Sequence, residues 1–263
     1  MLTLFRYLRE LAEHAHLILS FARRDIRAKY KQTVFGVAWA VLQPVSLMVV
    51  FTFVFSKFAR IDSEGIPYPI FAYSALIFWT SFASSVSQGT VAMTANASLV
   101  RKIYFPRETL LLAVLISSML DLAISASVFA GMFVYYGMPF SWTFLWIIPL
   151  LLLQVLFTVA VICVSSATHV YFRDIGHALP LLLQLWMLAT PVAYPLSSVP
   201  EWLQPLYLLN PMAPLVHGYR QVLLHRSPPD LGFLFPALVV ILMVATMAYL
   251  GFKRAEQTFA DVI

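Results

Sequence analysis

The stretch "FLWIIPLLLLQVLFTVAVICVSSAT", residues 144–168, contains no charged side chain. A helix needs about 20 consecutive apolar residues to cross the hydrocarbon core of a bilayer. The stretch also lacks the strict alternation of polar and apolar residues that is typical of the strands of membrane β-barrels. We therefore expect it to cross a membrane as a single α-helix, in which every backbone group is paired internally.

The rest of the chain has the same character. The charge-free run around this stretch covers residues 122–172, and others cover 32–56, 65–100, 175–200 and 231–252. Of the 263 residues, 61% are hydrophobic and 11% are charged, whereas about a quarter are charged in soluble domains. The sequence predicts an all-α integral membrane protein with six spans. These lie at about 34–57, 67–93, 109–136, 144–168, 177–195 and 231–252.

The Lys and Arg residues indicate how the chain is oriented. With six spans both termini lie on one side, and 13 of the 17 Lys and Arg residues fall on that side. Cytoplasmic loops carry the excess of positive charge in membrane proteins. We therefore expect both termini and the connection at residues 95–108 to face the cytoplasm.

Two segments outside the spans are also expected to be helical. Residues 1–33 form one unit, with apolar residues at helical spacing such as Leu8, Leu11, Ile18 and Ala22. This predicts an amphipathic helix along the inner membrane surface, before the six-span domain at residues 34–263. About thirty charged, amphipathic residues precede the first apolar run, so we expect no cleaved leader.

Residues 195–230 are too apolar for a solvated loop and too rich in proline for a span. Two short helices fit this segment, one capped by Ser198 before Pro200 and one capped by Asn210 before Pro211. We interpret it as a re-entrant or interfacial hairpin between spans five and six. An ordinary surface loop is the alternative.

Catalytic motifs are missing from the sequence. It contains no G-x-x-x-x-G-K-[ST] phosphate loop, no G-x-S-x-G turn and no H-E-x-x-H zinc helix. The histidines are scattered and Cys163 is the single cysteine, so we expect no metal site and no enzyme. Asp121 is the one ionised residue embedded in a predicted span. A proton relay or a substrate contact is possible there, but a structural hydrogen bond to nearby Ser or Thr groups is the favoured interpretation.

The connection "ANASLVRKIYFPRE", residues 95–108, is expected to form a rigid cytoplasmic knob. Asn96 can cap a short helix that runs through Ile103, and Phe105-Pro106 ends it. The knob would offer Leu99, Ile103, Tyr104 and Phe105 beside Arg101 and Lys102, a mixed apolar and basic surface that suits a partner protein. Alternatively, it is a basic turn that only enforces topology. The second connection, "HVYFRDIGH", carries Arg173-Asp174. This pair is either an interfacial ion pair at the membrane edge or a contact that holds the fourth and fifth spans against the same partner.

At these residues the sequence resembles the permeases of ABC type-2 polysaccharide exporters, which move O-antigen, capsule or teichoic acid chains. The resemblance covers nearly the whole chain in the order of the family. The matching stretches are "RRDIRAKYKQTVFGVAWAVLQP" (23–44), "NASLVRKIYFPRE" (96–108), "YFRDIGHALPLLLQLWMLATPVAYP" (171–195), "LNPMAPLVHGYRQVLL" (209–224) and "FADVI" (259–263).

This resemblance implies a homodimeric permease bound to two separate ATP-binding subunits, which hold ATP and Mg²⁺, while this chain holds no cofactor. It implies a lipid-linked polysaccharide as substrate, contacts with membrane lipids, and no nucleic acid. By analogy the knob is the main coupling helix and the second connection a smaller contact. The residues implied in coupling are Asn96, Ser98, Leu99, Val100, Arg101, Lys102, Ile103, Tyr104, Phe105, Pro106, Arg173 and Asp174.

The same resemblance gives the N-terminal helix a gating role beside the entry for the lipid-linked glycan. The cations there would attract any anionic head group by about 1 kcal/mol each; they are Arg23, Arg24, Arg27, Lys29 and Lys31. The resemblance also implies that spans one and five line a channel between protomers. The channel candidates, which could instead mark membrane interfaces, are Trp39, Gln43, Trp186, Thr190 and Tyr194.

Two other functions stay open at this point. A type-2 exporter of a smaller lipid or drug would share the six-span plan. A membrane enzyme acting on lipid-linked sugars would need a carboxylate or histidine cluster at a membrane face, where the sequence offers Asp121 alone.

Overall fold

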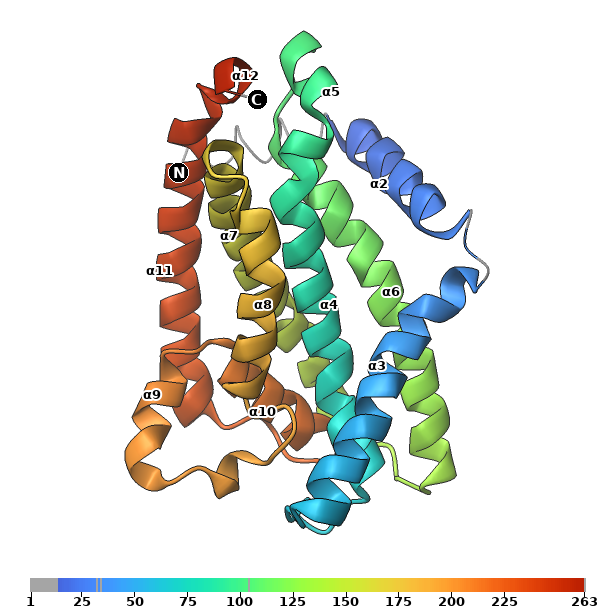
Figure 1. Cartoon of the computed structure of the whole chain (residues 1–263). Helices are drawn as coiled ribbons and strands as arrows, with labels where there is room; N and C mark the ends of the chain where they lie inside the picture. Colours follow the sequence, from blue (N-terminus) through green and yellow to red (C-terminus); the bar gives the residue numbers. More distant parts are fainter. Residues whose placement is uncertain (1–13, 32, 34, 104, 263) are drawn as a thin grey trace.

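The computed structural model describes residues 14–31, 33, 35–103 and 105–262, and every regular element in them is helical (Figure 1). Five helical segments are long and apolar enough to cross a membrane. Their bounds agree with the predicted spans to within a few residues. They are Gly36–Phe58 (η1 Gly36–Ala38, α3 Trp39–Phe51 and η2 Thr52–Phe58), α4 Tyr68–Ala95, α6 Glu108–Tyr135, Trp142–Tyr171 (η3 Trp142–Trp146 and α7 Ile147–Tyr171) and α11 Leu231–Glu256.

The remaining predicted span, residues 177–195, is only partly a regular helix. Helix α8 covers Ile175–Leu188, 14 residues, and ends in a turn at Ala189. At a rise of 1.5 Å per residue, α8 is about 21 Å long, shorter than the roughly 30 Å of a hydrocarbon core. The chain continues from Ala189 as turns and short 3₁₀ segments, η4 Leu196–Ser198 and η5 Glu201–Leu203.

Helix α4 is the centre of the bundle, and α3, α6, α7, α8 and α10 (Met212–Leu223) all pack against it. In its most apolar window 78% of the residues are buried, against 11% in the Gly36–Phe58 segment. Small side chains allow helices to approach closely in a membrane, where lipid and protein are equally apolar. At Gly89 the approach of α7 is so close that an added Cβ would lie 2.5 Å from Cγ2 of Ile162.

Several buried polar groups of α4 find hydrogen-bond partners inside the bundle. Ser85 and Thr90 each donate to the backbone carbonyl four residues earlier, both at 2.7 Å. Thr90 also contacts the hydroxyl of Ser165 on α7 at 2.7 Å, and Gln154 of α7 donates to the carbonyl of Phe78 at 3.0 Å. Because buried polar groups are costly without partners, these bonds let a hydroxyl-rich helix lie at the core.

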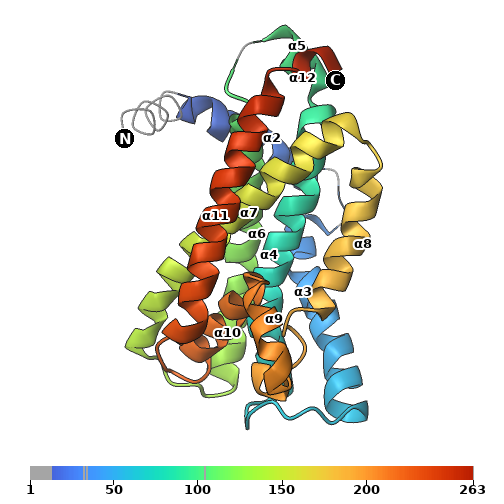
Figure 2. The same cartoon turned by 90° about the vertical axis from the view of Figure 1, so that its left-hand side faces the viewer.

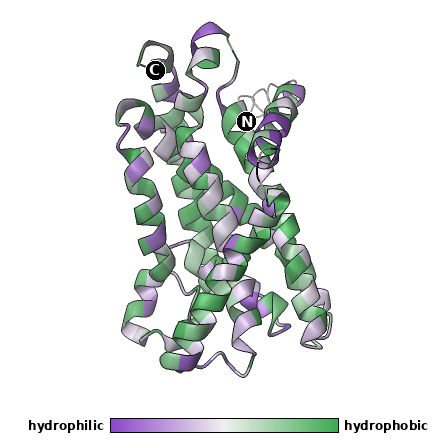
Figure 3. Cartoon of the chain, turned by 45° about the vertical axis from the view of Figure 1, so that its right-hand side comes forward, coloured by the Kyte–Doolittle hydropathy of each residue, from purple (hydrophilic) through white to green (hydrophobic). Residues whose placement is uncertain are grey.

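The other elements gather at the two ends of the bundle (Figures 1 and 2). Helices α5 (Ala97–Lys102) and α12 (Phe259–Val262) lie at one end, with α2 (Ala15–Tyr30) beside it. Helices α9 (Gln204–Leu208) and α10 lie at the opposite end. In Figure 3 the long helices are mainly green and white, and purple is dense on α2. The described part of the predicted N-terminal helix packs against α6 and buries Ile18 and Ala22, whereas residues 1–13 lie outside the described residues.

The segment between α8 and α11 contains two short α-helices, α9 and α10, where two were predicted. The predicted start of the first is wrong: Ser198 is the last residue of η4 and caps no helix, and α9 begins at Gln204. The side-chain carbonyl of Asn210 accepts from the backbone N–H of Met212 at 3.2 Å, so Asn210 stabilises the start of α10 as predicted. Tyr219 of α10 is fully buried and stacks on Phe78, with ring centroids 3.6 Å apart. That the segment forms a re-entrant or interfacial hairpin stays a prediction.

Arg220 is the buried cation of α10, with 3% exposure. Its guanidinium donates to the backbone carbonyls of Pro191, Val192 and Tyr194, the last at 2.9 Å, and lies 3.8 Å from the ring centroid of Phe71. A guanidinium has five N–H donors and can satisfy several carbonyls at once. It therefore holds the turn that follows α8 against α10.

The contact between Gly89 and Ile162 gives a test of the α4–α7 packing. Gly89→Ala should destabilise the protein by roughly 1–3 kcal/mol because an overpacked core must shift, and the same change should cost less in a chain that already carries Ile162→Ala, where the clashing atoms are absent. The measurement is thermal unfolding of the purified protein in detergent. Gly131→Ala is the matched control, because nothing lies within 4 Å of a Cβ there. Equal melting temperatures for Gly89→Ala and Gly131→Ala would contradict the close approach.

Candidate functional site

Helix α5 forms the predicted knob between α4 and α6. It begins after Asn96, as predicted, but its last helical residue is Lys102, one short of Ile103. The predicted cap is wrong: the Asn96 side chain accepts no bond from α5 and instead donates to the carbonyl of Ala92 at 2.8 Å. The Ala92 carbonyl lies in the last turn of α4, directly below Asn96, and accepts both the backbone N–H and the side-chain amide of that residue.

Fewer of the predicted residues of the knob are exposed than expected. Phe105 is 6% exposed and packs against Phe21 of α2, with ring centroids 5.9 Å apart, so its ring faces inward and is not offered to a partner. Val100 and Pro106 are also buried, and Tyr104 lies outside the described residues. The exposed members of the predicted set are Ser98, Arg101, Lys102 and Ile103, with Leu99 partly exposed.

The second predicted contact lies close to the first. Arg173 and Asp174 are both exposed in the short connection between α7 and α8. An open pocket of about 470 Å³ lies between this connection and the base of α5, and Ala97, His169, Arg173 and His177 are among its lining residues. The structure thus brings the two predicted contacts together around one pocket, although they are more than 60 residues apart in the sequence.

Asp121 does not bond to nearby Ser or Thr groups as expected. Its carboxylate pairs with the ammonium of Lys29 and accepts from the hydroxyl of Tyr30, both at the end of α2. The side chain of Asp121 is 13% exposed and that of Lys29 is 30% exposed, so this is a partly buried ion pair. Burial, followed by the hydrogen bond and charge of Asp121, raises the pKa of Tyr30 and keeps its hydroxyl protonated.

The predicted head-group cations divide into two kinds. Arg23, Arg24 and Arg27 are exposed on α2 and Lys31 is exposed directly after it, and Arg24 pairs with its neighbour Asp25 at 2.9 Å. Lys29 differs from them because it is partly buried and pairs with Asp121 of α6. The helical repeat points Lys29 toward α6, and its contact with a head group stays a prediction.

Two neighbouring pockets lie beside this ion pair. One, of about 270 Å³, is lined by Lys29, Trp39, Gln43 and Asp121 among others. The next, of about 360 Å³, shares Gln43 and extends between α4 and α8 to Gln184. Further polar groups come from α4 and were not selected from the sequence; they are Thr80, Ser84, Ser87 and Gln88. Hydroxyl and amide groups beside an indole ring suit a polar, hydroxylated ligand.

The other three channel candidates lie elsewhere. Trp186 donates from its indole to Asn210 at 2.9 Å, and Asn210 donates to the hydroxyl of Thr190 at 2.9 Å. Thr190 is fully buried and therefore faces no open space in this conformation. The hydroxyl of Tyr194 bonds to that of Tyr207 at 2.8 Å. These residues fasten the end of α8 to the α9–α10 segment, and only Trp39 and Gln43 line the pockets.

Several of the contacts that matter were missed by sequence reasoning. The Lys29–Asp121 pair joins residues 92 positions apart, and Arg107 meets Glu256 across 149 positions. The one available signal was a balance of charges, because each buried acid must find a cation somewhere in the chain. Within the described ranges, no group of three His, Cys, Asp or Glu residues could hold a metal ion.

The fold and these surfaces define a multi-pass integral membrane protein with a small basic knob at one end of its helical bundle. The profile of the ABC-2 type transporter family matches residues 16–224, about four fifths of the chain. The chain therefore belongs to the ABC-2 type transporter family.

Individual relatives extend this result over the full length. The chain is 30% identical over 263 residues to the O-antigen export system permease protein RfbA of Myxococcus xanthus, covering 99% of this chain and 100% of that protein. A Klebsiella pneumoniae protein of the same name is 28% identical over 94% of this chain and 95% of its own length. The polysialic acid transport protein KpsM of Escherichia coli is 22% identical over 76% of this chain and 78% of that protein.

The contact between Asp121 and the end of α2 can be tested by proteolysis. Asp121→Asn should weaken the docking of α2 by roughly 1–3 kcal/mol, because a charged hydrogen-bonded partner is lost. Trypsin should then cleave near Arg23 to Arg27 faster in the purified protein. The rate should rise about tenfold for each 1.4 kcal/mol if α2 detaches and docks again fast relative to cleavage. Asp25→Asn, which removes an equal charge on α2 itself, is the control and should leave cleavage near the native rate. Identical rates in both variants would show that the pair does not hold α2.

Proposed function

We propose that this chain is the permease of an ATP-driven exporter of a lipid-linked polysaccharide of the O-antigen kind, in the bacterial inner membrane. The full-length match to an O-antigen export system permease carries the proposal. A polysialic acid transport protein among the relatives supports a polysaccharide substrate. ATP and Mg²⁺ belong to a separate ATPase subunit in this proposal, in keeping with the missing phosphate loop.

The complex would contain two copies of this chain and two ATPase subunits. The outer face of α3 and η2 supports a second copy, since large apolar residues such as Val49, Phe53 and Phe58 are more than half exposed there. In a membrane this face contacts either lipid or protein. A two-fold interface at this face would bring the pockets beside Gln43 in the two protomers toward a shared path.

The proposed coupling surface is the exposed part of α5 together with Arg173 and Asp174. Arg101, Lys102 and Ile103 combine charge with an apolar side chain, a mixture that suits a protein partner. The pocket between the two elements would receive part of the ATPase. Movement of the ATPase pair would then be passed to the spans on either side of α5.

We infer six crossings with both termini in the cytoplasm. Helix α7 ends at the same end of the bundle as α5, whereas α11 begins at the opposite end, beside α9 and α10 (Figures 1 and 2). The chain from α8 through residue 195 therefore runs along the bundle between the two ends. In this arrangement α8 and its extension to residue 195 form the fifth crossing, and residues 196–223 form the hairpin at the outer face.

The substrate would enter beside α2, whose exposed cations Arg23, Arg24, Arg27 and Lys31 attract an anionic lipid head group. Trp39 and Gln43 would contact the glycan in the pockets next to Asp121. A smaller lipid or drug remains the second candidate, because the exposed cations and pockets do not by themselves require a polymer. An enzyme acting on lipid-linked sugars has less support, because these pockets contain one carboxylate, Asp121, and no histidine.

Loss of the gene should abolish a surface glycan in the source bacterium, and the intact chain should restore it, because no other part of the exporter forms the path. The measurement is glycan extraction and electrophoresis of cells with and without the gene. Accumulation of glycan inside the cell is expected at the same time. An unchanged surface glycan with altered lipid export would favour the smaller substrate, and turnover of lipid-linked sugar by the purified chain alone would favour the enzyme.

The orientation can be measured independently with cysteine labelling. Lys102→Cys should react with a membrane-impermeant maleimide only after cells are permeabilised, because α5 faces the cytoplasm in the proposed topology. Tyr135→Cys, at the opposite end and 83% exposed, should react in intact cells. The native Cys163 is buried and should give little background. Labelling of position 102 in intact cells would reverse the proposed orientation and remove α5 from reach of any ATPase.

A further inference from the structure

We propose that the C-terminal brace, which we define as Lys253, Glu256, Thr258 and Phe259, ties together the two connections that contact the ATPase, so that they move with the last span as one unit. This inference rests on the proposed function. It concerns residues outside the coupling surface itself, at the junction of α11 and α12. The role of the brace is positional, since none of its members is proposed to touch ATP or the glycan.

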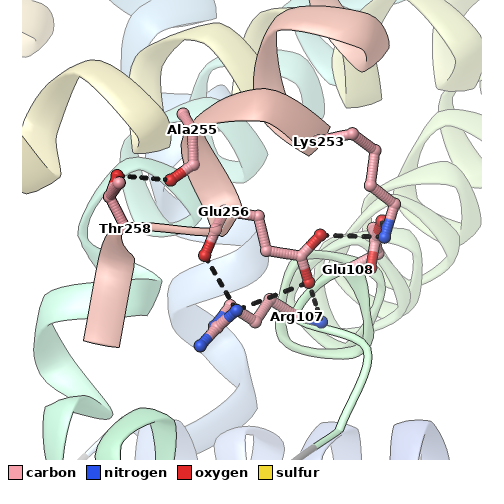
Figure 4. A network of polar contacts seen from close by, with 6 residues as sticks. All are labelled: Arg107, Glu108, Lys253, Ala255, Glu256 and Thr258. Carbon is pink, nitrogen blue, oxygen red and sulfur yellow. Dashed lines mark hydrogen bonds and ion pairs between the residues drawn. The ribbon is translucent and has the colours of Figure 1, made fainter. Parts of the chain in front are cut away.

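The first half of the brace contacts Arg107 and Glu108, at the start of α6 and shortly after the end of α5 (Figure 4). Arg107 donates to the backbone carbonyl of Glu256 at 2.9 Å, and its guanidinium lies 3.7 Å from the Glu256 carboxylate. Lys253 pairs with that carboxylate at 2.8 Å and also with Glu108. These four charges link the two residues just after the knob to the last turn of α11.

The second half of the brace holds the end of α7, next to the other predicted contact. The hydroxyl of Thr258 bonds to that of Tyr171, the last residue of α7. Phe259 is fully buried, and its ring lies 6.4 Å from Tyr171 and 5.6 Å from Phe252. Helix α12 contacts both α5 and α7. Arg173 therefore lies two residues from one attachment point of the brace, and Arg107 is the other.

The ion pairs of the charged half are buried enough to fix α6 against α11. Exposed ion pairs contribute little to stability, but the side chains of Glu108, Glu256 and Arg107 are 7%, 14% and 15% exposed. Two cations face two carboxylates, so the group is neutral and each charge has an opposite neighbour. Breaking a buried pair by removing one partner is costly, because the other charge stays uncompensated. The cluster thus favours one fixed arrangement of α6 against α11.

Helix α5 itself cannot supply this rigidity. It has six residues, and a helix of that length is not stable by itself in water. It is held by its two neighbouring spans, by the contact of Phe105 with Phe21 on the α2 side, and by the brace on the α11 side. A displacement of α5 moves the neighbouring helices only if rigid contacts join them to it. The brace extends them to α7 and α11, the two spans on the far side from α2.

The charged half is tested with the double variant Glu108→Gln, Lys253→Met, which removes one cation and one anion and leaves Arg107 paired with Glu256. The chain is expressed with its ATPase subunit in cells that lack the gene. We expect the variant to co-purify with the ATPase and to retain ATP hydrolysis, while surface glycan per assembled complex falls at least about fivefold, the lower end of coupling between linked sites. The control is Arg254→Met, which removes an exposed cation one position away.

The aromatic half is tested with Phe259→Ala, which leaves no buried charge behind. Its control is Val262→Ala in the same short helix, where the side chain is 44% exposed. The same separation of ATP hydrolysis from export is expected for Phe259→Ala and not for Val262→Ala. If either test variant assembles and exports at the wild-type ratio to ATP hydrolysed, the brace does not transmit movement. Loss of assembled complex in both test variants would also overturn the inference, by assigning these residues to folding alone.

The two proposals fail in different ways. If the wild-type gene restores no surface glycan to the deleted strain, the proposed function is wrong and the brace is left without a process to serve. If the wild type restores the glycan and both test variants restore it equally well per complex, the proposed function stands and the brace is wrong.

Discussion

Hydrocarbon offers no partner to a charge or to a free backbone group, and this constraint arranges the whole molecule. The long segments are helical because a helix pairs its own backbone. The charged contacts described above then fall at the ends of the bundle or form compact pairs, such as Lys29 with Asp121 at the inner end of α2 and Lys253 with Glu108 at the end of α11. Inside α4, Thr90 bonds both to its own helix and to Ser165 of α7. The charged clusters and polar pockets described above therefore lie at the ends of the bundle and between α3, α4 and α8.

The sequence predicts the parts of the fold that depend on local composition. Five apolar segments, the short helix α5 and the start of α10 follow from apolar runs, prolines and Asn210, because these effects act within a few positions. Helix α8 departs from its predicted length, since Ala189 to Pro195 reads as a continuous apolar run but forms turns held by Arg220. Periodicity cannot show that a distant guanidinium satisfies those carbonyls.

The candidate site was predictable in kind and less so in detail. Basic residues between spans pointed to the knob, and Arg101 and Lys102 are indeed exposed on it. The sequence predicts Phe105 on the same surface, but its ring lies against Phe21, because an aromatic ring beside an amphipathic helix gains more from burial than from exposure. Thr190, a predicted channel residue, is also buried. Asp121 was recognised as unusual, but its partners lie on a helix that contacts α6 only in the folded chain.

Arg220 grips the chain after α8 through backbone oxygens alone. A carbonyl is present whatever side chain its residue carries, so this anchor makes no demand on the identities of residues 191, 192 and 194. Packing still constrains the buried side chains of Pro191 and Val192, but the hydrogen bonds that fix the path of this segment do not. A designer who wishes to reshape the end of the bundle that holds α9 and α10 would find there a length of backbone held by one arginine, with exposed side chains shortly after it, such as Ser198, left available for variation.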